Sequence, residues 1–211
     1  NAFIIGFNHN AILEGSNRIH FKIGKIGNTQ VGLCDSEYGN YTSTSGAFTM
    51  NTSNTNSGGW ANSHMRKTVL GSDASPTSPR ANTLLAALPA DLRAVMKPIT
   101  KYSDNTGGGN NTASYVTSTT DYLPLLSEFE YHGTRTYANS AEQNFQQQYA
   151  YYQAGNSKVH YKHNATGTAA YAWCRSVDAT TTDYFCLVYT NGNATSGYAY
   201  SSWAVAAGFA A

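Results

Sequence analysis

The chain has 211 residues and a formal net charge of +1, and only 12% of its residues are charged. The length suits one domain, and the near-neutral balance excludes the basic stripe of a nucleic-acid-binding protein and a polybasic membrane contact. With 16 Tyr, 8 Phe and 3 Trp, the chain is too aromatic to be disordered. Residues 2–6 form an apolar run too short for a signal peptide or a spanning helix, so we expect no membrane insertion.

The amino-terminal half predicts a short hairpin followed by helices. Apolar and polar residues alternate over 19–24 and 30–33 around Gly and Asn, which is typical of two paired strands. Residues 41–59 read as a Ser/Thr/Asn/Gly loop. The apolar residues of 60–70 have helical spacing, and a second pair of helical turns is expected over 84–93, with Pro89 near the start of the second turn.

The middle of the chain predicts strands. Residues 97–102 read as a strand that leads into a flexible loop over 104–113, which includes three consecutive glycines. Residues 122–130 read as a buried strand, in which Pro124 indicates a bend or an edge.

The last third predicts one longer helix and then short strands. Ser140 precedes a helix expected from Ala141 to about Gln153, with Phe145, Tyr149 and Tyr152 on its buried face. Short strands are expected over 170–173, 185–188 and 198–205. Short antiparallel strands with long loops and two or three helices indicate an α+β fold in a single domain over residues 1–211.

Two acidic residues and an arginine are weighed as catalytic or anion-binding groups. Glu128 and Glu130 are two apart on the expected strand, so both carboxylates would share one face, as an acid and base pair could. The preferred interpretation is structural, with carboxylates that accept hydrogen bonds from backbone or Arg. Arg175 could bind an anion, but we expect an interior side chain that bridges backbone carbonyls beneath Trp173. We predict no catalytic residue.

The histidines and cysteines match no metal or cofactor motif. His160 and His163 form a close pair without a second pair of ligands, so surface or loop positions are favoured. Cys34, Cys174 and Cys186 fit neither a disulfide framework nor a zinc spacing. A bridge between Cys174 and Cys186 stays open, with buried free thiols favoured. We expect no metal and no cofactor.

The most informative stretch lies between Trp173-Cys174-Arg175-Ser176 and Val205-Ala206-Ala207-Gly208-Phe209. From Asp178 to Trp203 the chain consists mostly of Thr, Ser, Tyr, Asn, Gly and Ala. Tyr and Trp provide large contact areas with few rotatable bonds, and Ser, Asn and Gly provide adaptable hydrogen bonds, as in antibody paratopes. We predict a ligand-binding surface here, and a polar loop without a partner is the alternative. The predicted ligand-binding residues are Asp178, Thr180, Thr182, Asp183, Tyr184, Tyr189, Tyr198, Tyr200, Ser201 and Trp203.

Several motifs occur together in one order along the chain. They are Gly58-Gly59-Trp60, Ser63, Met65-Arg66, Leu88-Pro89, Leu92-Arg93, Leu126-Ser127-Glu128, Trp173-x-Arg175-Ser176 and Gly208-Phe209. In these motifs, residues 19–209 resemble an uncharacterised family of bacterial and phage proteins with the C-type lectin fold, in its formylglycine-generating-enzyme-like variety. The resemblance implies an α+β scaffold in which Trp60, Arg66, Trp173 and Arg175 are structural.

The carboxy-terminal part also resembles variable proteins of diversity-generating retroelements, which randomise codons at adenine positions near the end of a C-type lectin domain. Replacing the adenines of an AAC codon never gives Lys, Glu, Gln, Met or Trp, and none of these occurs from Asp178 to Ser202. The resemblance therefore implies a variable binding surface over 177–203. Two departures are Cys174, where the family more often has Leu, and Ala204 to Phe209, where it has Gly-Val-Ala-Pro-Gly-Phe.

These resemblances imply a non-enzymatic recognition or adhesion domain on a phage particle or a bacterial surface. Its ligand would be a protein or a glycan of a host cell or of the environment, and a homo-oligomer or attachment to a virion would fit this role. One alternative is a structural virion or surface protein whose loops only pack against neighbours. The other is an oxidase related to the formylglycine-generating enzyme, whose reactive cysteine pair has no counterpart motif near Cys174 or Cys186.

Overall fold

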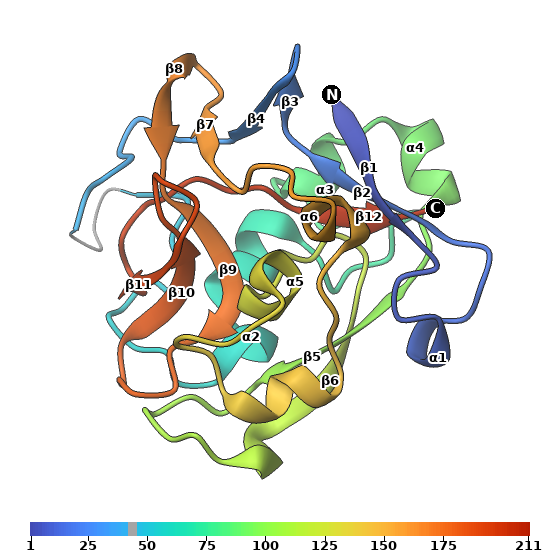
Figure 1. The fold of residues 1–211 in the computed structure, drawn as a ribbon. Coiled ribbons are helices and arrows are strands. Elements are labelled where there is room, and N and C mark those ends of the chain that lie inside the picture. Colours follow the sequence, from blue (N-terminus) through green and yellow to red (C-terminus); the bar gives the residue numbers. More distant parts are fainter. Residues whose placement is uncertain (42–45) are drawn as a thin grey trace.

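A computed structural model describes residues 1–41 and 46–211 and has an α+β fold, in which short helices pack around several small sheets (Figure 1). The predicted α+β class is confirmed. Residues 42–45, which belong to the loop expected over 41–59, lie outside the described residues. Within the described part, no helix is long and apolar enough to cross a bilayer.

The two ends of the chain meet in one antiparallel sheet. Strand β2 (Ile19–Ile23) lies between β1 (Ala2–Phe7) and β12 (Gly208–Ala210). The rings of Phe21 and Phe209 stack across this sheet with their centroids 5.0 Å apart. The short helix α1 (Ala11–Glu14) lies in the connection between β1 and β2.

The hairpin predicted from 19–24 and 30–33 is wrong in its pairing. Gly24 adopts a φ of 115°, and after it only β3 (Lys25–Ile26) pairs with β4 (Thr29–Gly32). Strand β4 continues parallel to β7 (His160–Lys162), which pairs with β8 (Ala165–Ala170). Apolar alternation predicts a strand but not its partner. Here β4 takes β7 as a partner, from more than a hundred residues further along the chain.

The helical segment predicted over 60–70 is divided in two. Helix α2 (Gly59–Asn62) ends at Ser63, whose backbone is extended, and a π-helix, η1 (Met65–Leu70), follows. The Ser63 hydroxyl accepts a hydrogen bond from the Arg66 amide and donates one to the Trp60 carbonyl, which fixes this break. The helical turns expected over 84–93 are confirmed as α3 (Leu84–Ala87) and α4 (Ala90–Val95), with Pro89 at the start of α4.

The strand expected over 97–102 is confirmed as β5 (Ile99–Asp104), which pairs with β6 (Val116–Asp121) after a short 3₁₀ turn, η2 (Ala113–Tyr115). The strand predicted over 122–130 is wrong, because the chain forms helix α5 (Glu128–His132) there. The Ser127 hydroxyl accepts from the Glu130 amide, and the Glu130 carboxylate accepts from the Ser127 amide. This capping box favours a helix start over a strand.

The helix predicted over 141–153 is also wrong as a continuous element. It consists of a 3₁₀ turn, η3 (Ser140–Asn144), and a short helix, α6 (Ala150–Gln153). Gln146 and Gln148 between them donate to the carbonyls of Tyr102 and Tyr131, so their side chains bind other segments of the chain. Tyr149 and Tyr152 are buried as predicted, but Phe145 is 36% exposed.

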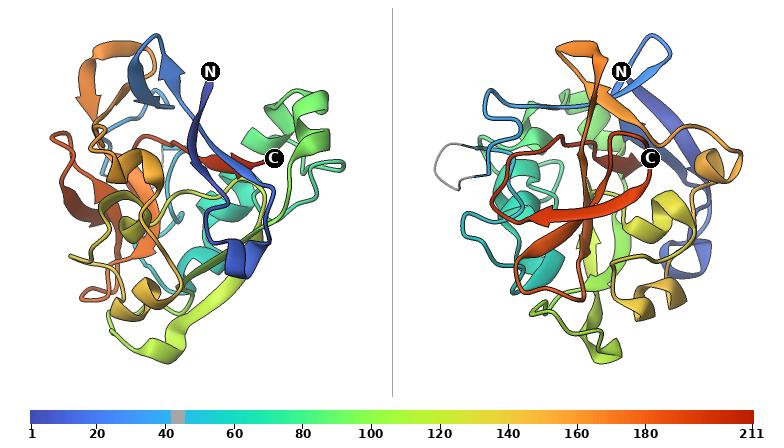
Figure 2. Two further views of the ribbon diagram at one scale, coloured as in Figure 1. Left: turned by 45° about the vertical axis from the view of Figure 1, so that its right-hand side comes forward. Right: turned by 60° about the vertical axis from the view of Figure 1, so that its left-hand side comes forward.

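The carboxy-terminal third forms a three-stranded antiparallel sheet. Its order is β11 (Ala194–Tyr198), β10 (Tyr184–Val188), β9 (Ala172–Val177), so strands are confirmed near 170–173 and at 185–188. The strand predicted over 198–205 is wrong, because β11 ends at Tyr198 and the chain then runs buried and irregular past Trp203. Figure 2 shows β10 and β11 on one side of the molecule in its left view, opposite α3 and α4.

Candidate binding site

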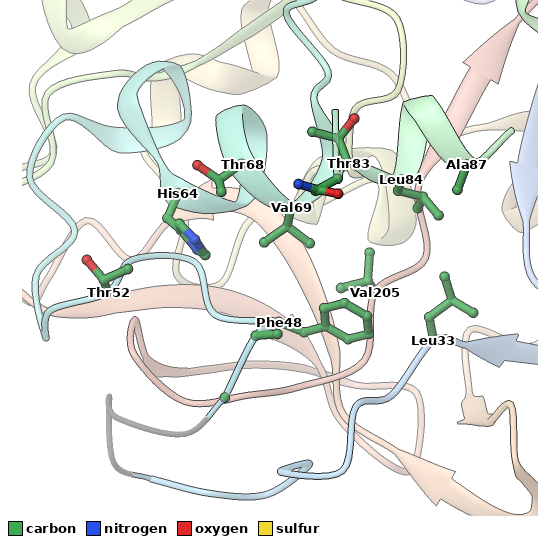
Figure 3. A pocket seen from close by; sticks show the side chains of 13 residues that line it. Leu33, Phe48, Thr52, His64, Thr68, Val69, Thr83, Leu84, Ala87 and Val205 are labelled. Atoms are coloured by element: carbon green, nitrogen blue, oxygen red, sulfur yellow. The ribbon is translucent and has the colours of Figure 1, made fainter. Parts of the chain in front are cut away.

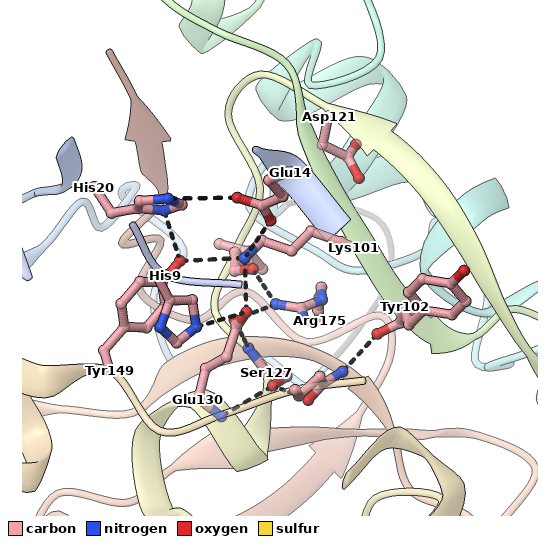
Figure 4. A network of polar contacts seen from close by, with 12 residues as sticks. His9, Glu14, His20, Lys101, Tyr102, Asp121, Ser127, Glu130, Tyr149 and Arg175 are labelled. Carbon is pink, nitrogen blue, oxygen red and sulfur yellow. Dashed lines mark hydrogen bonds and ion pairs between the residues drawn. The ribbon is translucent and has the colours of Figure 1, made fainter. Parts of the chain in front are cut away.

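A fully buried ionic cluster joins Arg175 of β9 to Lys101 of β5 and Glu130 of α5 (Figure 4). The Arg175 side chain donates to the Leu125 carbonyl at 3.0 Å and to the Ser103 hydroxyl at 2.9 Å, and it forms an ion pair with Glu130. Lys101 contacts the same carboxylate at 2.7 Å. Burial alone would raise the pKa of Glu130, but Arg175 and Lys101 hold it well below its usual range. Arg175 is thus an interior side chain, as expected.

The two glutamates weighed as an acid and base pair have structural partners. The Glu128 carboxylate accepts hydrogen bonds from the backbone amides of Thr136, Tyr137 and Ala138 at 2.7 to 3.1 Å. Glu130 binds Arg175 and Lys101. Both carboxylates are 1% exposed or less, so they hold loops and charges inside the fold.

His9, Glu14 and His20, from the segment around α1, contact the same cluster. Glu14 lies 3.4 Å from the His20 ring and 3.9 Å from Lys101, and the His9 ring stacks on Tyr149. Burial raises the pKa of Glu14 to about 7 and lowers that of His20 to about 3. The cluster therefore contains neutral histidines and a carboxyl group that titrates near neutral pH.

The buried Asp121 carboxylate binds side chains of both α2 and η1. Asp121 accepts from the Trp60 indole nitrogen at 3.1 Å and from Arg66 Nε at 2.7 Å. Trp173, on β9, is fully buried and donates from its indole nitrogen to the Phe48 carbonyl at 2.9 Å. Trp60, Arg66, Trp173 and Arg175 are all buried in the interior.

The structure separates the ten predicted ligand-binding residues into three groups. Those on the outside are Thr180, Thr182, Tyr189 and Tyr198; the half-buried ones are Asp183, Tyr184 and Tyr200; the buried ones are Asp178, Ser201 and Trp203. Asp178 lies beneath the surface, where its carboxylate accepts from the amide and the hydroxyl of Thr180. Composition does not distinguish the exposed side chains of this segment from those that fold inward.

Four of these side chains, Tyr184, Tyr189, Tyr198 and Trp203, line one open pocket of about 240 Å³. Tyr41 and Tyr171, which the sequence did not predict, complete its aromatic lining. Tyr41 is brought here because the Gly39 amide donates to the Ser202 carbonyl at 2.9 Å and the Ser202 amide donates to the Asn40 carbonyl at 3.2 Å. No sequence signal marked Tyr41, because it is far from the segment along the chain.

Four tyrosines of this pocket lie in two contacting pairs. A hydrogen bond with Tyr198 raises the pKa of Tyr184 to about 12, and one with Tyr189 raises that of Tyr171 to about 12. The rings of each pair meet nearly at right angles, with centroids 4.6 and 4.9 Å apart. Within each pair the edge of one ring therefore packs against the face of the other.

A larger cavity, of about 590 Å³, lies elsewhere (Figure 3). Leu33, Phe48, Val69, Leu84 and Val205 give it an apolar lining, and His64 lies at its edge. It includes none of the ten predicted residues. The larger volume by itself indicates no chemistry.

None of the described histidines and cysteines lines the tyrosine-lined pocket. Within the described residues, no group of three or more His, Cys, Asp and Glu side chains is placed to hold a metal ion. The surface position expected for His160 is wrong, since it is fully buried and contacts Lys22. The three cysteines are free and buried, as favoured, and burial raises the pKa of the Cys174 and Cys186 thiols.

Comparison with known proteins gives one match. Residues 37–207 match the model of a family described as a domain of unknown function (DUF6273). No curated protein and no solved structure matches the chain significantly. Since the match covers most of the 211 residues, the chain belongs to the DUF6273 family.

Proposed function

We propose that the protein is a non-enzymatic recognition domain that displays a ligand-binding surface on a phage particle or a bacterial cell. Its ligand is a protein or a glycan of a host cell or of the environment. The observation that carries this proposal is the gathering of Tyr184, Tyr189, Tyr198 and Trp203 around one open pocket. Aromatic residues of this kind dominate the energetics of binding surfaces.

The contrast between this face and its support favours recognition. Beneath the face, Trp173 and Arg175 are fully buried and each is held by hydrogen bonds to other segments. On the face, Thr180, Thr182 and Tyr189 are exposed. Variable side chains on a rigid scaffold are the usual arrangement of binding loops.

The arrangement of strands supports a C-type lectin-like fold as the finer assignment. The first and last strands of the chain share one sheet through β2, and the late strands β9, β10 and β11 form a second sheet that carries the face. The sheet formed by the two ends of the chain contains none of the strands β9, β10 and β11. Those late strands and their loops can therefore differ between copies without changing that sheet. This supports a diversified surface over 177–203.

A binding screen tests the proposal. The purified, fluorescently labelled protein is applied to an array of microbial glycans and to a panel of bacterial cells. We expect the wild type to bind at least one target and the Tyr198→Ala variant to bind it at least tenfold more weakly, as expected for the loss of an aromatic anchor worth about 2 kcal/mol.

Phe145→Ala is the matched control for this screen. Phe145 and Tyr198 are both 36% exposed, and Phe145 stacks on Tyr102 away from the tyrosine-lined pocket. The control should therefore bind like the wild type. Equal losses in the two variants, or no binding to any target, would contradict a dedicated recognition face.

A further inference from the structure

The tyrosine-lined pocket contains a buried hydrogen-bond donor without a partner. Trp203 is 5% exposed, and its indole nitrogen, Nε1, finds no acceptor among the described residues. Buried indole N–H groups normally find a partner, because leaving the donor unpaired is costly. An acceptor atom of a ligand would satisfy this one.

Gly197 packs beside this nitrogen because it has no side chain. A methyl group at Gly197 would lie 3.6 Å from Nε1 of Trp203 and only 2.9 Å from a methyl carbon of Leu187. Both Gly197 and Trp203 line the pocket. The indole nitrogen therefore lies just behind the part of the pocket wall that Gly197 forms, and a side chain at position 197 would crowd both Leu187 and the indole.

Flat aromatic rings form the rest of the wall. The Tyr171 ring lies 4.8 Å from the Trp203 ring and 4.9 Å from the Tyr189 ring, measured between centroids. Thr195 and Ser196 add hydroxyl groups from β11. Ring faces carry partial negative charge, so they attract the slightly positive C–H groups of a saturated ring.

The chemistry of the lining selects the ligand class. None of the described residues that line the pocket is charged, so an anion would find no counter-charge. Aromatic cages also bind quaternary ammonium groups, but a cation would meet the positive end of the Trp203 N–H. The volume of about 240 Å³ is smaller than the roughly 300–1,000 Å³ of sites for drug-sized molecules, so it suits a single ring.

We propose that this pocket binds the neutral pyranose ring at the end of a glycan. In the bound state Trp203 Nε1 donates to a sugar oxygen, and the exposed ring of Tyr189 packs on the C–H face of the sugar. This inference rests on the proposed recognition function and chooses the glycan over the protein as its ligand. It requires no metal ion, because aromatic contact and one buried donor supply the affinity.

The test uses neutral methyl pyranosides of glucose, galactose, mannose and N-acetylglucosamine as probes. Saturation-transfer NMR detects their binding to the full chain, and titration gives the dissociation constant. We expect at least one of the four to bind in the millimolar range or better, and tetramethylammonium not to displace it. No binding of any of the four, or displacement by tetramethylammonium, overturns the proposal.

Trp203→Phe is the decisive variant, because it keeps an aromatic ring and removes the indole donor. Trp203 is buried in the main core, so the smaller ring also leaves a cavity and should lower Tm. Binding is therefore measured at a temperature at which circular dichroism shows the variant to be folded. Binding of the pyranoside should weaken by about tenfold, as for one lost hydrogen bond. Gly197→Ala should weaken it as well, because the added methyl group would crowd Leu187 and the indole nitrogen, whereas Phe145→Ala should leave it unchanged.

The outcomes separate this inference from the recognition function. If the labelled protein binds cells through Tyr198 but no pyranoside binds or competes, the ligand is not a glycan and the recognition function stands. If Trp203→Phe binds the sugar as well as the wild type, the indole donor has no role and the proposed mode is wrong. If nothing binds in either assay, both proposals fail.

Discussion

Replacing Trp173 by alanine tests whether the interior below the binding face is a packed scaffold. The side chain is fully buried in the main core and donates a hydrogen bond to the Phe48 carbonyl at 2.9 Å. Removing it opens a cavity that costs about 3–5 kcal/mol. The lost hydrogen bond to the Phe48 carbonyl, which still accepts from the Trp203 amide, adds about 1 kcal/mol. The expected loss of about 4–6 kcal/mol approaches the whole stability of a marginal domain.

Tyr198→Ala provides the comparison. Its ring is 36% exposed and packs on the rings of Tyr184 and Tyr200, so its loss should cost about 1 kcal/mol. Thermal unfolding followed by near-ultraviolet circular dichroism measures both variants. For a chain of this size we expect Tm to fall by about 10–20 °C for Trp173→Ala and by less than about 4 °C for Tyr198→Ala. If Tyr198→Ala unfolds as early as Trp173→Ala, the tyrosines belong to the core and the binding-face interpretation fails.

Three further predictions concern the ionic cluster and metal dependence. Because burial raises the pKa of Glu14 from 4.5 to about 7, its ionisation removes stability as pH rises through that window. The free energy of unfolding in urea is measured for the wild type and for Glu14→Gln. Relative to the wild type, the variant should gain about 2–3 kcal/mol as the pH rises from 4.5 to 8. A difference between the two proteins that does not change with pH would refute this. Arg175→Met leaves Glu130 buried without its guanidinium, so it should lose about 3–5 kcal/mol in the same assay, and wild-type stability would contradict the buried ion pair. Ligand binding should survive EDTA. A calcium site needs about six to eight oxygen ligands, and the stretch from Asp178 to Trp203 offers only Asp178 and Asp183 as carboxylates. Loss of binding in EDTA with recovery in calcium would contradict this.

Residue patterns predicted those parts of the fold that local forces decide. The α+β class, β5, β10, α3 and α4 follow from alternation, helical spacing and a proline at a helix start. The errors arose where side chains bind distant backbone. Gln146 and Gln148 bind other segments and interrupt the helix expected over 141–153. At 122–130, the Ser127 to Glu130 capping box was present in the sequence and would have predicted α5.

The candidate site was predictable as a segment but not as a surface. Composition selected the stretch that contains Tyr184, Tyr189 and Tyr198, and these residues do meet at one pocket. The burial of Asp178 and Ser201, and the arrival of Tyr41, depend on contacts between segments far apart in sequence. No periodicity in a single chain encodes such contacts.

Sequencing many copies of this locus from one natural population tests the central claim most directly. If residues 177–203 form a diversified recognition surface on a fixed scaffold, substitutions should concentrate from Asp178 to Ser202. Within that stretch they should spare Phe185, Leu187 and Val188, which are buried in β10. Trp173 and Arg175 should stay constant among the copies. Substitutions spread evenly over residues 1–211 would contradict a diversified surface.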